Sequence, residues 1–153
     1  MPRRTQGDPV LANNRKAFHD YNVVERFEAG IQLTGTEVKS CRARSIQLGE
    51  GYAKIDKNQC FLHNVHISIY GFGNRYNHEV KRSRRLLLHK REILKYAQWI
   101  GTKGGTLVPL SMYLKNGLIK VEMAYCQGKT HSDQRETLKK RDDEKAMRRA
   151  MLK

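Results

Sequence analysis

The sequence lacks long hydrophobic runs, paired cysteines and the start of a secretory signal. No apolar segment approaches the roughly 20 residues that a helix needs to cross a bilayer. Residues 1–10 contain no apolar stretch of the kind that begins a signal peptide. The three cysteines, Cys41, Cys60 and Cys126, show no C-x-x-C spacing. We therefore expect small buried thiols in a cytoplasmic protein, with no membrane partner.

Motifs that commonly mark an enzyme are absent as well. There is no phosphate-binding glycine loop, and paired carboxylates are scarce outside the cluster at 142–144. Cys60, His63 and His66 lie close in sequence, but on a strand His63 faces away from the other two. No local signature supports a Cys–His nucleophilic pair. We expect no catalytic residue, no metal and no cofactor.

Positive charge is what the sequence has in excess. Its 30 Lys and Arg residues against 15 Asp and Glu residues give a formal net charge of +15. Self-repulsion of this size is relieved when a polyanion binds, so nucleic acid is the leading partner. A membrane surface is the competing partner, but it requires an amphipathic helix with large apolar anchors, and none is apparent.

Hydrophobic periodicity predicts a fold that is mainly β. Apolar residues of one parity from Tyr21 to Leu33, interrupted only by Glu25, indicate a long half-buried strand. Thr34 and Glu37 form a capping-box pattern that starts a short helix at 35–44. Further strands are expected at 52–55, 59–63 and 65–69, and a second helix at 92–100, whose apolar positions are Ile93, Leu94, Ala97 and Ile100.

The strands at 107–115 and 118–126 flank Asn116-Gly117, which predicts a hairpin because both residues tolerate positive φ. Short strands with two or three helices favour a small closed barrel over a sandwich. We expect a loose arm at 1–13, one folded domain at 14–128 and a basic tail at 129–153.

The segment 81–95, K-R-S-R-R-L-L-L-H-K-R-E-I-L-K, concentrates the charge. Lys81, Arg82, Arg84 and Arg85 can neutralise phosphates, although most charge runs are only solvated loops. Phe72, Tyr76 and His78 either stack on exposed bases or cover the end of the barrel. RNA is favoured over DNA, because no helix-turn-helix or zinc finger is present.

The tail has the composition of a helix that forms on a partner. Glu136 and Lys140, like Glu144 and Arg148, stand at i,i+4 spacing with the acid first. The segment buries almost nothing by itself, and isolated short helices are marginal in water. The alternative is a disordered solubilising tail.

Several collinear motifs resemble the SmpB family of SsrA-binding proteins over nearly the whole chain. They are N-R-K-A at 14–17, F-E-A-G-I at 27–31, G-T-E-V-K-S at 35–40, L-L-L-H-K-R-E at 86–92, L-V-P-L at 107–110 and R-E-T-L-K-K-R-D at 135–142. The resemblance implies an OB-like β-barrel with flanking helices that binds the tRNA-like domain of transfer-messenger RNA in bacteria and catalyses no bond change.

The resemblance further implies delivery of that RNA, with elongation factor Tu bound to it, to ribosomes stalled on truncated messages. The tail is then expected to enter the empty mRNA path near the decoding centre of the small subunit. Carried over by motif, the RNA-facing residues are Asn14, Glu28, Leu87, His89, Lys120 and Lys129. The ribosome-facing tail residues are Asp133, Arg135, Lys139, Lys140, Arg141 and Arg148, and Thr130 and Gln134 stand where the family usually has lysines.

Ordinary structural roles remain open for two of these residues, a core position for Leu87 and an ion pair with a nearby Arg for Glu28. A second function is also open at this point. The same features suit a general single-stranded-RNA-binding or ribosomal protein with an OB-type fold.

Overall fold

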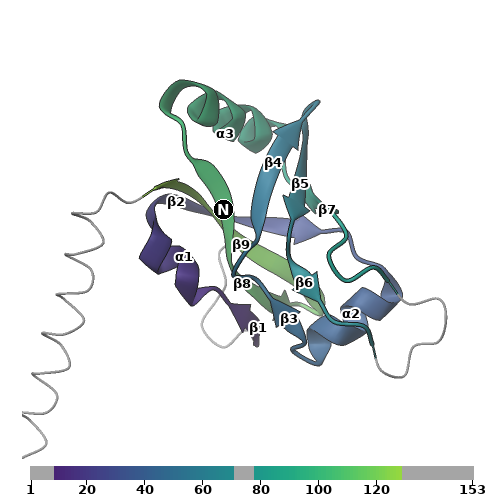
Figure 1. The fold of residues 1–153 in the computed structure, drawn as a ribbon. Coiled ribbons are helices and arrows are strands. Elements are labelled where there is room, and N and C mark those ends of the chain that lie inside the picture. The colour runs from purple at the N-terminus through teal and green to yellow at the C-terminus, as the bar shows by residue number, and fades with distance from the viewer. Residues whose placement is uncertain (1–8, 71–77, 129–153) are drawn as a thin grey trace, which may run out of the picture.

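The computed structural model describes residues 9–70 and 78–128, in which a ring of strands carries three helices (Figure 1). The chain begins with a strand, a short helix and the longest strand of its first half. The elements in order are β1 (Val10–Asn13), α1 (Arg15–Asp20), β2 (Tyr21–Ile31), α2 (Gly35–Arg42), β3 (Ile46–Gln47), β4 (Tyr52–Asp56), β5 (Gln59–His63), β6 (His66–Ile67), β7 (Arg84–Leu87), α3 (Lys90–Lys103), β8 (Thr106–Lys115) and β9 (Leu118–Gly128).

The main sheet closes on itself. Its strands follow the order β8–β4–β5–β7–β2–β9, and β9 pairs again with β8 to complete the ring. All pairings are antiparallel, β1 pairs with residues 111–113 of β8, beyond its pairing with β4 at Leu107, and β3 and β6 form a separate two-stranded sheet. This confirms the predicted class, a mainly β fold with a small closed OB-like barrel and flanking helices.

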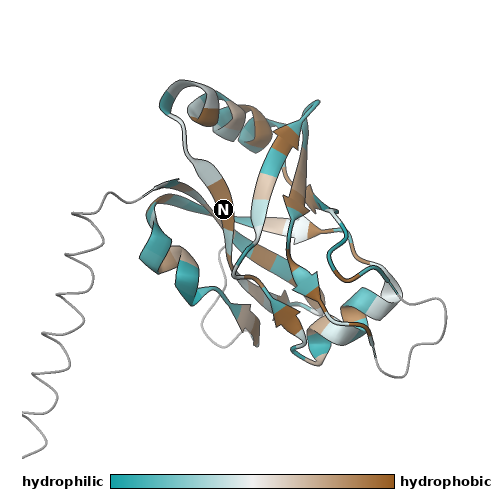
Figure 2. Cartoon of the chain, in the orientation of Figure 1, coloured by the Kyte–Doolittle hydropathy of each residue, from teal (hydrophilic) through white to brown (hydrophobic). Residues whose placement is uncertain are grey.

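The core fills the inside of this ring. Phe27, Ala29, Met112, Val121 and Met123 are among its fully buried side chains. Hydrophobic and hydrophilic residues alternate along the strands in Figure 2, as expected for strands with one face inside and one outside. Burial of each large apolar side chain contributes about 1.5–3 kcal/mol to folding.

A bulge in β2 explains the interruption of the predicted pattern at Glu25. Val23 pairs with Cys126 and Glu25 with Tyr125, so β2 carries one extra residue at Val24, which is 54% exposed. Before the bulge, Tyr21 and Val23 pack toward α1 outside the ring. After it, Phe27 and its neighbours of the same parity point inside. The predicted single face is therefore two faces joined at a bulge.

Helix α3 starts earlier and ends later than predicted. Its first turn is bonded to the carbonyl of His89, and its end is set by Gly104, whose φ is +73°. The expected apolar face is correct at Ile93, which is buried, and wrong at Leu94, which is 50% exposed, and at Ala97, which is also exposed. Tyr96 is buried beside Ile93 instead. Tyr96 stacks on Phe27 with 4.3 Å between ring centroids, which fixes α3 against the ring.

Two differences appear near the N-terminus. The arm expected at 1–13 ends inside the fold, because Ala12 and Asn13 pair with Met112 and Ser111 and Leu11 is buried. Helix α1 was not predicted; its six residues are too few to show a helical period. Within the described ranges, no helix is long and apolar enough to cross a membrane.

Local predictions based on turn and cap chemistry hold. Asn116 and Gly117 both have positive φ, +51° and +78°, in the tight hairpin between β8 and β9. Helix α2 has the expected capping box: the Thr34 side chain accepts from the Glu37 N–H, and Glu37 accepts from the Thr34 N–H at 2.9 Å. The strand expected at 65–69 is reduced to β6, and Ile69 is 58% exposed.

Candidate nucleic-acid interface

Three strands place the predicted residues Leu87 and Lys120 in one row on the outside of the ring. Gly30 on β2 pairs with Leu87 on β7 on one side and with Lys120 on β9 on the other. Glu28 lies two residues from Gly30 on the same face of β2, and Leu118 lies two residues from Lys120 on β9. We call Glu28, Gly30, Leu87, Leu118 and Lys120 the open sheet face.

Helix α1 explains why this face ends where it does. Further along β9, the outward residues Ala124 and Cys126 are covered by Ala17 of α1 together with Val108 and Leu110 of β8. Helix α1 thus covers one half of the outer surface of the sheet and leaves the half that carries Lys120 uncovered.

Gly30 makes the open sheet face flat and apolar. A Cβ built on Gly30 would lie 3.2 Å from the Cβ of Leu87, so the missing side chain lets Leu87 lie across β2. The adjoining depression has a volume of about 290 Å³, and its apolar lining includes Leu33, Val38 and Leu118. Leu87 is 52% exposed, so the ordinary alternative of a core position is excluded.

Leu118 was missed in the sequence, although a signal for it exists. It is 61% exposed and pairs with Lys115 across the two-residue Asn-Gly turn. The turn length fixes this pairing, which puts Leu118 and Lys120 on the same face of β9. The hairpin sequence alone therefore predicts that this leucine lies beside a lysine on that face of β9.

Glu28 is held by β8, and 9% of its side chain remains exposed. Its Oε2 accepts hydrogen bonds from the Tyr113 hydroxyl and from Lys115 Nζ, the latter at 3.3 Å. Both bonds go to one oxygen, so Oε1 keeps its capacity to accept from a base amino group or a 2′-OH. The expected alternative, an ion pair with an arginine, is replaced by this Tyr–Lys pair.

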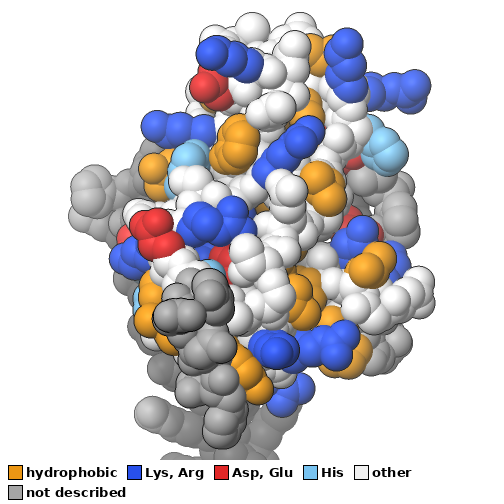
Figure 3. All heavy atoms as spheres, turned by 90° about the vertical axis from the view of Figure 1, so that its right-hand side faces the viewer, with side chains coloured by type: hydrophobic (Ala, Val, Ile, Leu, Met, Phe, Trp, Pro, Cys, Tyr) orange, Lys and Arg blue, Asp and Glu red, His pale blue; other side chains and the backbone are white. Residues whose placement is uncertain are grey.

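Three cations on β9, on β7 and just before β7 have no carboxylate partner among the described residues. Lys81, Arg85 and Lys120 form no ion pair with any residue in the described parts of the chain, and Lys81 and Arg85 are exposed. His89 is exposed as well, at the start of α3. Figure 3, which shows the side where α2 and β7 lie, displays basic side chains interleaved with exposed hydrophobic ones. Such interleaving suits phosphate contacts beside base or sugar contacts.

Arg84 corrects the predicted basic strap. Its side chain is 0% exposed and donates from Nε to Glu37, from Nη1 to the Val65 carbonyl at 2.9 Å and from Nη2 to the Val80 carbonyl at 3.1 Å. On β7 the parity places Arg84 and Leu86 inside and Arg85 and Leu87 outside. Arg84 is therefore a structural residue, and its predicted contact with RNA is wrong.

Arg82 takes part in the buried ion network and is also partly exposed. It donates to Glu37 Oε1 at 2.5 Å, and its side chain remains 35% exposed. Of the four cations predicted in the strap, Lys81 and Arg85 are thus fully available, Arg82 is partly engaged and Arg84 is buried.

Glu37 stays ionised inside this network. Burial opposes the charged form, but the hydrogen bonds from Arg82, the Thr34 N–H and Arg84 outweigh it and lower the pKa of Glu37 to about 2, from an ordinary 4.5. A pKa lowered by folding stabilises the protein above pH 4.5, and that stabilisation is lost as the pH falls toward 2.

We expect a measurable consequence in acid. Between pH 6 and pH 3 the Glu37 network should lose about 2 kcal/mol of stability. Urea unfolding at both values should therefore show a drop that is larger by this amount in the wild type than in Glu37→Gln, which has no group to titrate there. Equal drops in the two proteins would show that Glu37 is not ionised below its ordinary pKa.

Asn14 also has a structural role. Its side chain is 2% exposed and caps α1: Oδ1 accepts from the Ala17 N–H at 3.1 Å, while Nδ2 donates to the Pro109 carbonyl at 2.8 Å and the Leu48 carbonyl at 3.3 Å. The prediction that Asn14 faces RNA is wrong, because every polar atom of its amide is already bonded inside the protein.

His78 is anchored rather than available for stacking. Its Nε2 donates to the Ile67 carbonyl and its Nδ1 accepts from the Thr36 hydroxyl, both at 2.9 Å. The other expected contacts lie outside the described residues. They are Phe72 and Tyr76 of the loop, and Lys129, Asp133, Arg135, Lys139, Lys140, Arg141 and Arg148 of the tail.

The cysteines are buried and protonated at neutral pH. Burial raises the pKa of Cys41 and of Cys60 to about 12 and that of Cys126 to about 11. All three are free thiols, as expected. A thiol held protonated in the core is not a nucleophile.

Comparison with known proteins identifies the family behind this geometry. The model of the SmpB protein family matches residues 11–153. The chain belongs to the SmpB family. An SsrA-binding protein of Lactobacillus delbrueckii subsp. bulgaricus is 53% identical over 149 residues, covering 97% of each chain. An SsrA-binding protein of Levilactobacillus brevis is 54% identical over 144 residues, covering 94% of this chain and 92% of the relative.

The fold agrees with that of the family. A solved chain from a structure titled "tmRNA-SmpB: a journey to the center of the bacterial ribosome" is 38% identical, with a TM-score of 0.67. The match covers 85% of this chain and 94% of that solved chain.

Proposed function

We propose that this protein is an RNA-binding adaptor of ribosome rescue. It binds the tRNA-like domain of transfer-messenger RNA and accompanies it to ribosomes stalled on truncated messages. Membership of the SmpB family and the solved relative named for tmRNA, SmpB and the ribosome support this proposal. The observation that carries it is the row of Leu87, Gly30 and Lys120 across β7, β2 and β9.

The open sheet face suits a folded RNA better than a free strand. Leu87 and Leu118 offer an apolar floor for a sugar edge or an unstacked base, Lys120 neutralises a phosphate, and Glu28 accepts from a 2′-OH or a base amino group. These contacts are spaced on a rigid sheet, so they require phosphate, sugar and base groups at fixed relative positions.

We assign the remaining segments by the same proposal. The barrel of 14–128, together with β1, is the RNA-binding body. The tail at 129–153, which lies outside the described residues, enters the empty mRNA path near the decoding centre. Elongation factor Tu is an indirect partner through the charged RNA. The protein acts in the bacterial cytoplasm and makes or breaks no bond itself.

Competition between two RNAs tests this proposal. A gel shift of the labelled tRNA-like domain at physiological salt should be displaced by unlabelled tRNA-like RNA at least tenfold more effectively than by unstructured RNA of equal length, because only the folded RNA fits the fixed spacing. Equal displacement would instead support the alternative, a general single-stranded-RNA-binding or ribosomal protein of the same fold.

A further inference from the structure

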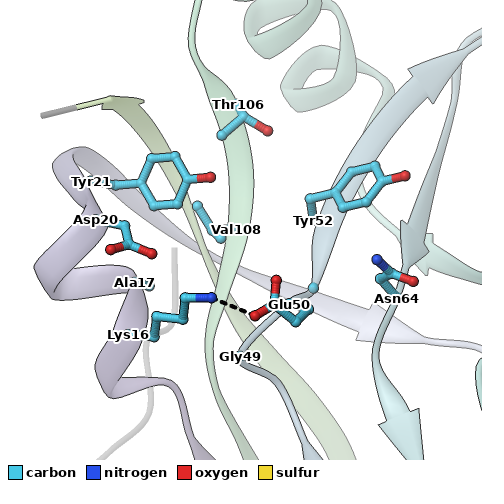
Figure 4. Close-up of a pocket in the computed structure, with 11 residues that line it drawn as sticks. Lys16, Ala17, Asp20, Tyr21, Gly49, Glu50, Tyr52, Asn64, Thr106 and Val108 are labelled. Atoms are coloured by element: carbon cyan, nitrogen blue, oxygen red, sulfur yellow. Dashed lines mark hydrogen bonds and ion pairs between the residues drawn. The ribbon is translucent and has the colours of Figure 1, made fainter.

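A second cavity lies on another part of the surface, between α1 and β4. Its volume is about 330 Å³, at the lower end of the roughly 300–1,000 Å³ typical of ligand sites. It shares no lining residue with the depression beside Leu87. Figure 4 shows side chains from α1, from the first residue of β2, from the turn before β4, from β4 itself, from the residue after β5 and from β8 around one space. They include Lys16, Asp20, Tyr21, Glu50, Tyr52, Asn64 and Thr106.

Two tyrosines line opposite sides of this cavity. Tyr21 opens β2 beside α1, and Tyr52 opens β4. Tyr52 is held in place from outside by the ring of His63, 5.4 Å away between centroids, and by Lys54 Nζ, 5.7 Å from its ring centre. Both tyrosines are only half-buried, so each keeps a ring surface on which a planar group can stack.

Glu50 supplies an acceptor at the edge of the cavity. One of its carboxylate oxygens pairs with Lys16 Nζ, and the other points into the space between the tyrosines (Figure 4). The turn that carries Glu50 is fixed by Gly51. Its N–H donates to the Leu48 carbonyl at 2.8 Å, and a Cβ there would lie 2.7 Å from Val65 Cγ2 and 2.9 Å from Pro109 Cγ.

The charge pattern around the cavity favours a base whose phosphates stay outside. Two carboxylates, Asp20 and Glu50, line the cavity against one ammonium, that of Lys16, and the exposed cations Arg15 and Lys54 flank it. A phosphate is repelled from the interior and attracted to the flanks. A cationic side chain of another protein would meet the same flanking cations and is disfavoured.

We propose that this cavity binds an unpaired guanine of an RNA, stacked on the ring of Tyr52. Guanine is the base whose Watson–Crick edge carries two adjacent donors, N1–H and the 2-amino group, and a single carboxylate accepts both. Glu50 is the acceptor, and Arg15 and Lys54 neutralise the adjoining phosphates. The inference rests on the proposed function only in taking RNA as the ligand, and it adds a base-specific contact away from the open sheet face.

Three labelled pentaribonucleotides, UUGUU, UUIUU and UUAUU, test the assignment by fluorescence anisotropy. The wild type should bind the guanine oligomer roughly tenfold more tightly than the adenine one. The inosine oligomer, which lacks the 2-amino group, should fall between them. Glu50→Gln replaces an acceptor oxygen by a donor on a side chain that is 68% exposed, so it should abolish the preference without unfolding the protein.

Tyr52→Leu should weaken binding of the guanine oligomer roughly tenfold through lost stacking. The matched control is Phe18→Leu, which removes a 39% exposed ring from α1 outside the cavity and should change binding less than twofold. Thermal melts of both variants confirm that they are folded. Equal affinities for the three oligomers, or a preference that survives Glu50→Gln, would overturn the inference.

Two further readouts separate this inference from the proposed function. Glu50→Gln should leave binding of the tRNA-like domain at the open sheet face within about twofold, whereas Leu87→Asp should weaken it and leave the guanine preference intact. If the wild type binds tRNA-like RNA but does not discriminate between the oligomers, the guanine inference is wrong and the proposed function is unaffected. If N-acetyl-arginine amide shifts the cavity's amide resonances and the guanine oligomer does not, the cavity holds a protein cation and the base assignment is wrong.

Discussion

Arg84→Met is expected to lower the free energy of unfolding by about 3–5 kcal/mol, because it removes the fully buried cation that pairs with the buried carboxylate of Glu37. The substitution also removes the hydrogen bonds that Arg84 donates to the carbonyls of Val65 and Val80. Small domains are stable by only about 5–15 kcal/mol, so urea unfolding should show a clearly lower midpoint.

Arg85→Met is the matched control for this prediction. Arg85 is the next residue on β7 and carries the same charge, but its side chain is exposed and unpaired within the described structure, so stability should change by less than about 0.5 kcal/mol. Adding Glu37→Leu to Arg84→Met should restore part of the loss, since the buried carboxylate, which then has only Arg82 as a cationic partner, is gone. If Arg84→Met were no more destabilising than Arg85→Met, the buried ion network would not hold the strap to α2.

Truncation after Gly128 is expected to separate two activities. Loss of the tail should abolish peptide tagging on ribosomes that hold no message past the P site, because the segment assigned to the mRNA path is gone. Affinity for the tRNA-like domain should fall only by the contribution of one phosphate contact, that of Lys129. In vitro translation of a message without a stop codon measures tagging, and a gel shift measures affinity.

The outcome of truncation bears on the division between body and tail. β9 is paired with β2 from Lys120 to Gly128, so the shortened chain keeps its complete ring of strands. Affinity that drops together with tagging would mean that the RNA-binding surface extends into the tail, and the boundary at 128 would be wrong.

The sequence predicted most accurately the features that depend on residues close together in the chain. The Asn116-Gly117 hairpin and the Thr34–Glu37 capping box depend on residues that are adjacent or one turn apart, so their patterns predicted them correctly. Leu118 could have been added by the same reasoning, since a two-residue turn fixes the register of both strands.

Contacts between distant segments decided what the sequence left open. Asn14 and Arg84 are residue types that are common on RNA-binding surfaces. However, Asn14 donates a hydrogen bond to Pro109 on β8, 95 residues away in the sequence, and Arg84 donates one to Glu37 on α2, 47 residues away. The row that joins Leu87, Gly30 and Lys120 depends on β2 lying between β7 and β9, which no local pattern states. For that reason the sequence indicated candidate RNA-binding residues, and the fold was needed to separate those on the open sheet face from those that are buried, Asn14 and Arg84.

The affinity of Leu87→Asp for the tRNA-like domain tests the central claim most directly. Leu94→Asp on α3 is its control, because Leu94 is 50% exposed against 52% for Leu87 and lies outside the open sheet face. The account predicts a loss of about 2 kcal/mol, roughly thirtyfold in Kd, for Leu87→Asp at physiological salt and less than twofold for Leu94→Asp. Equal effects of the two substitutions, with both proteins folded, would contradict the assignment of RNA binding to this face.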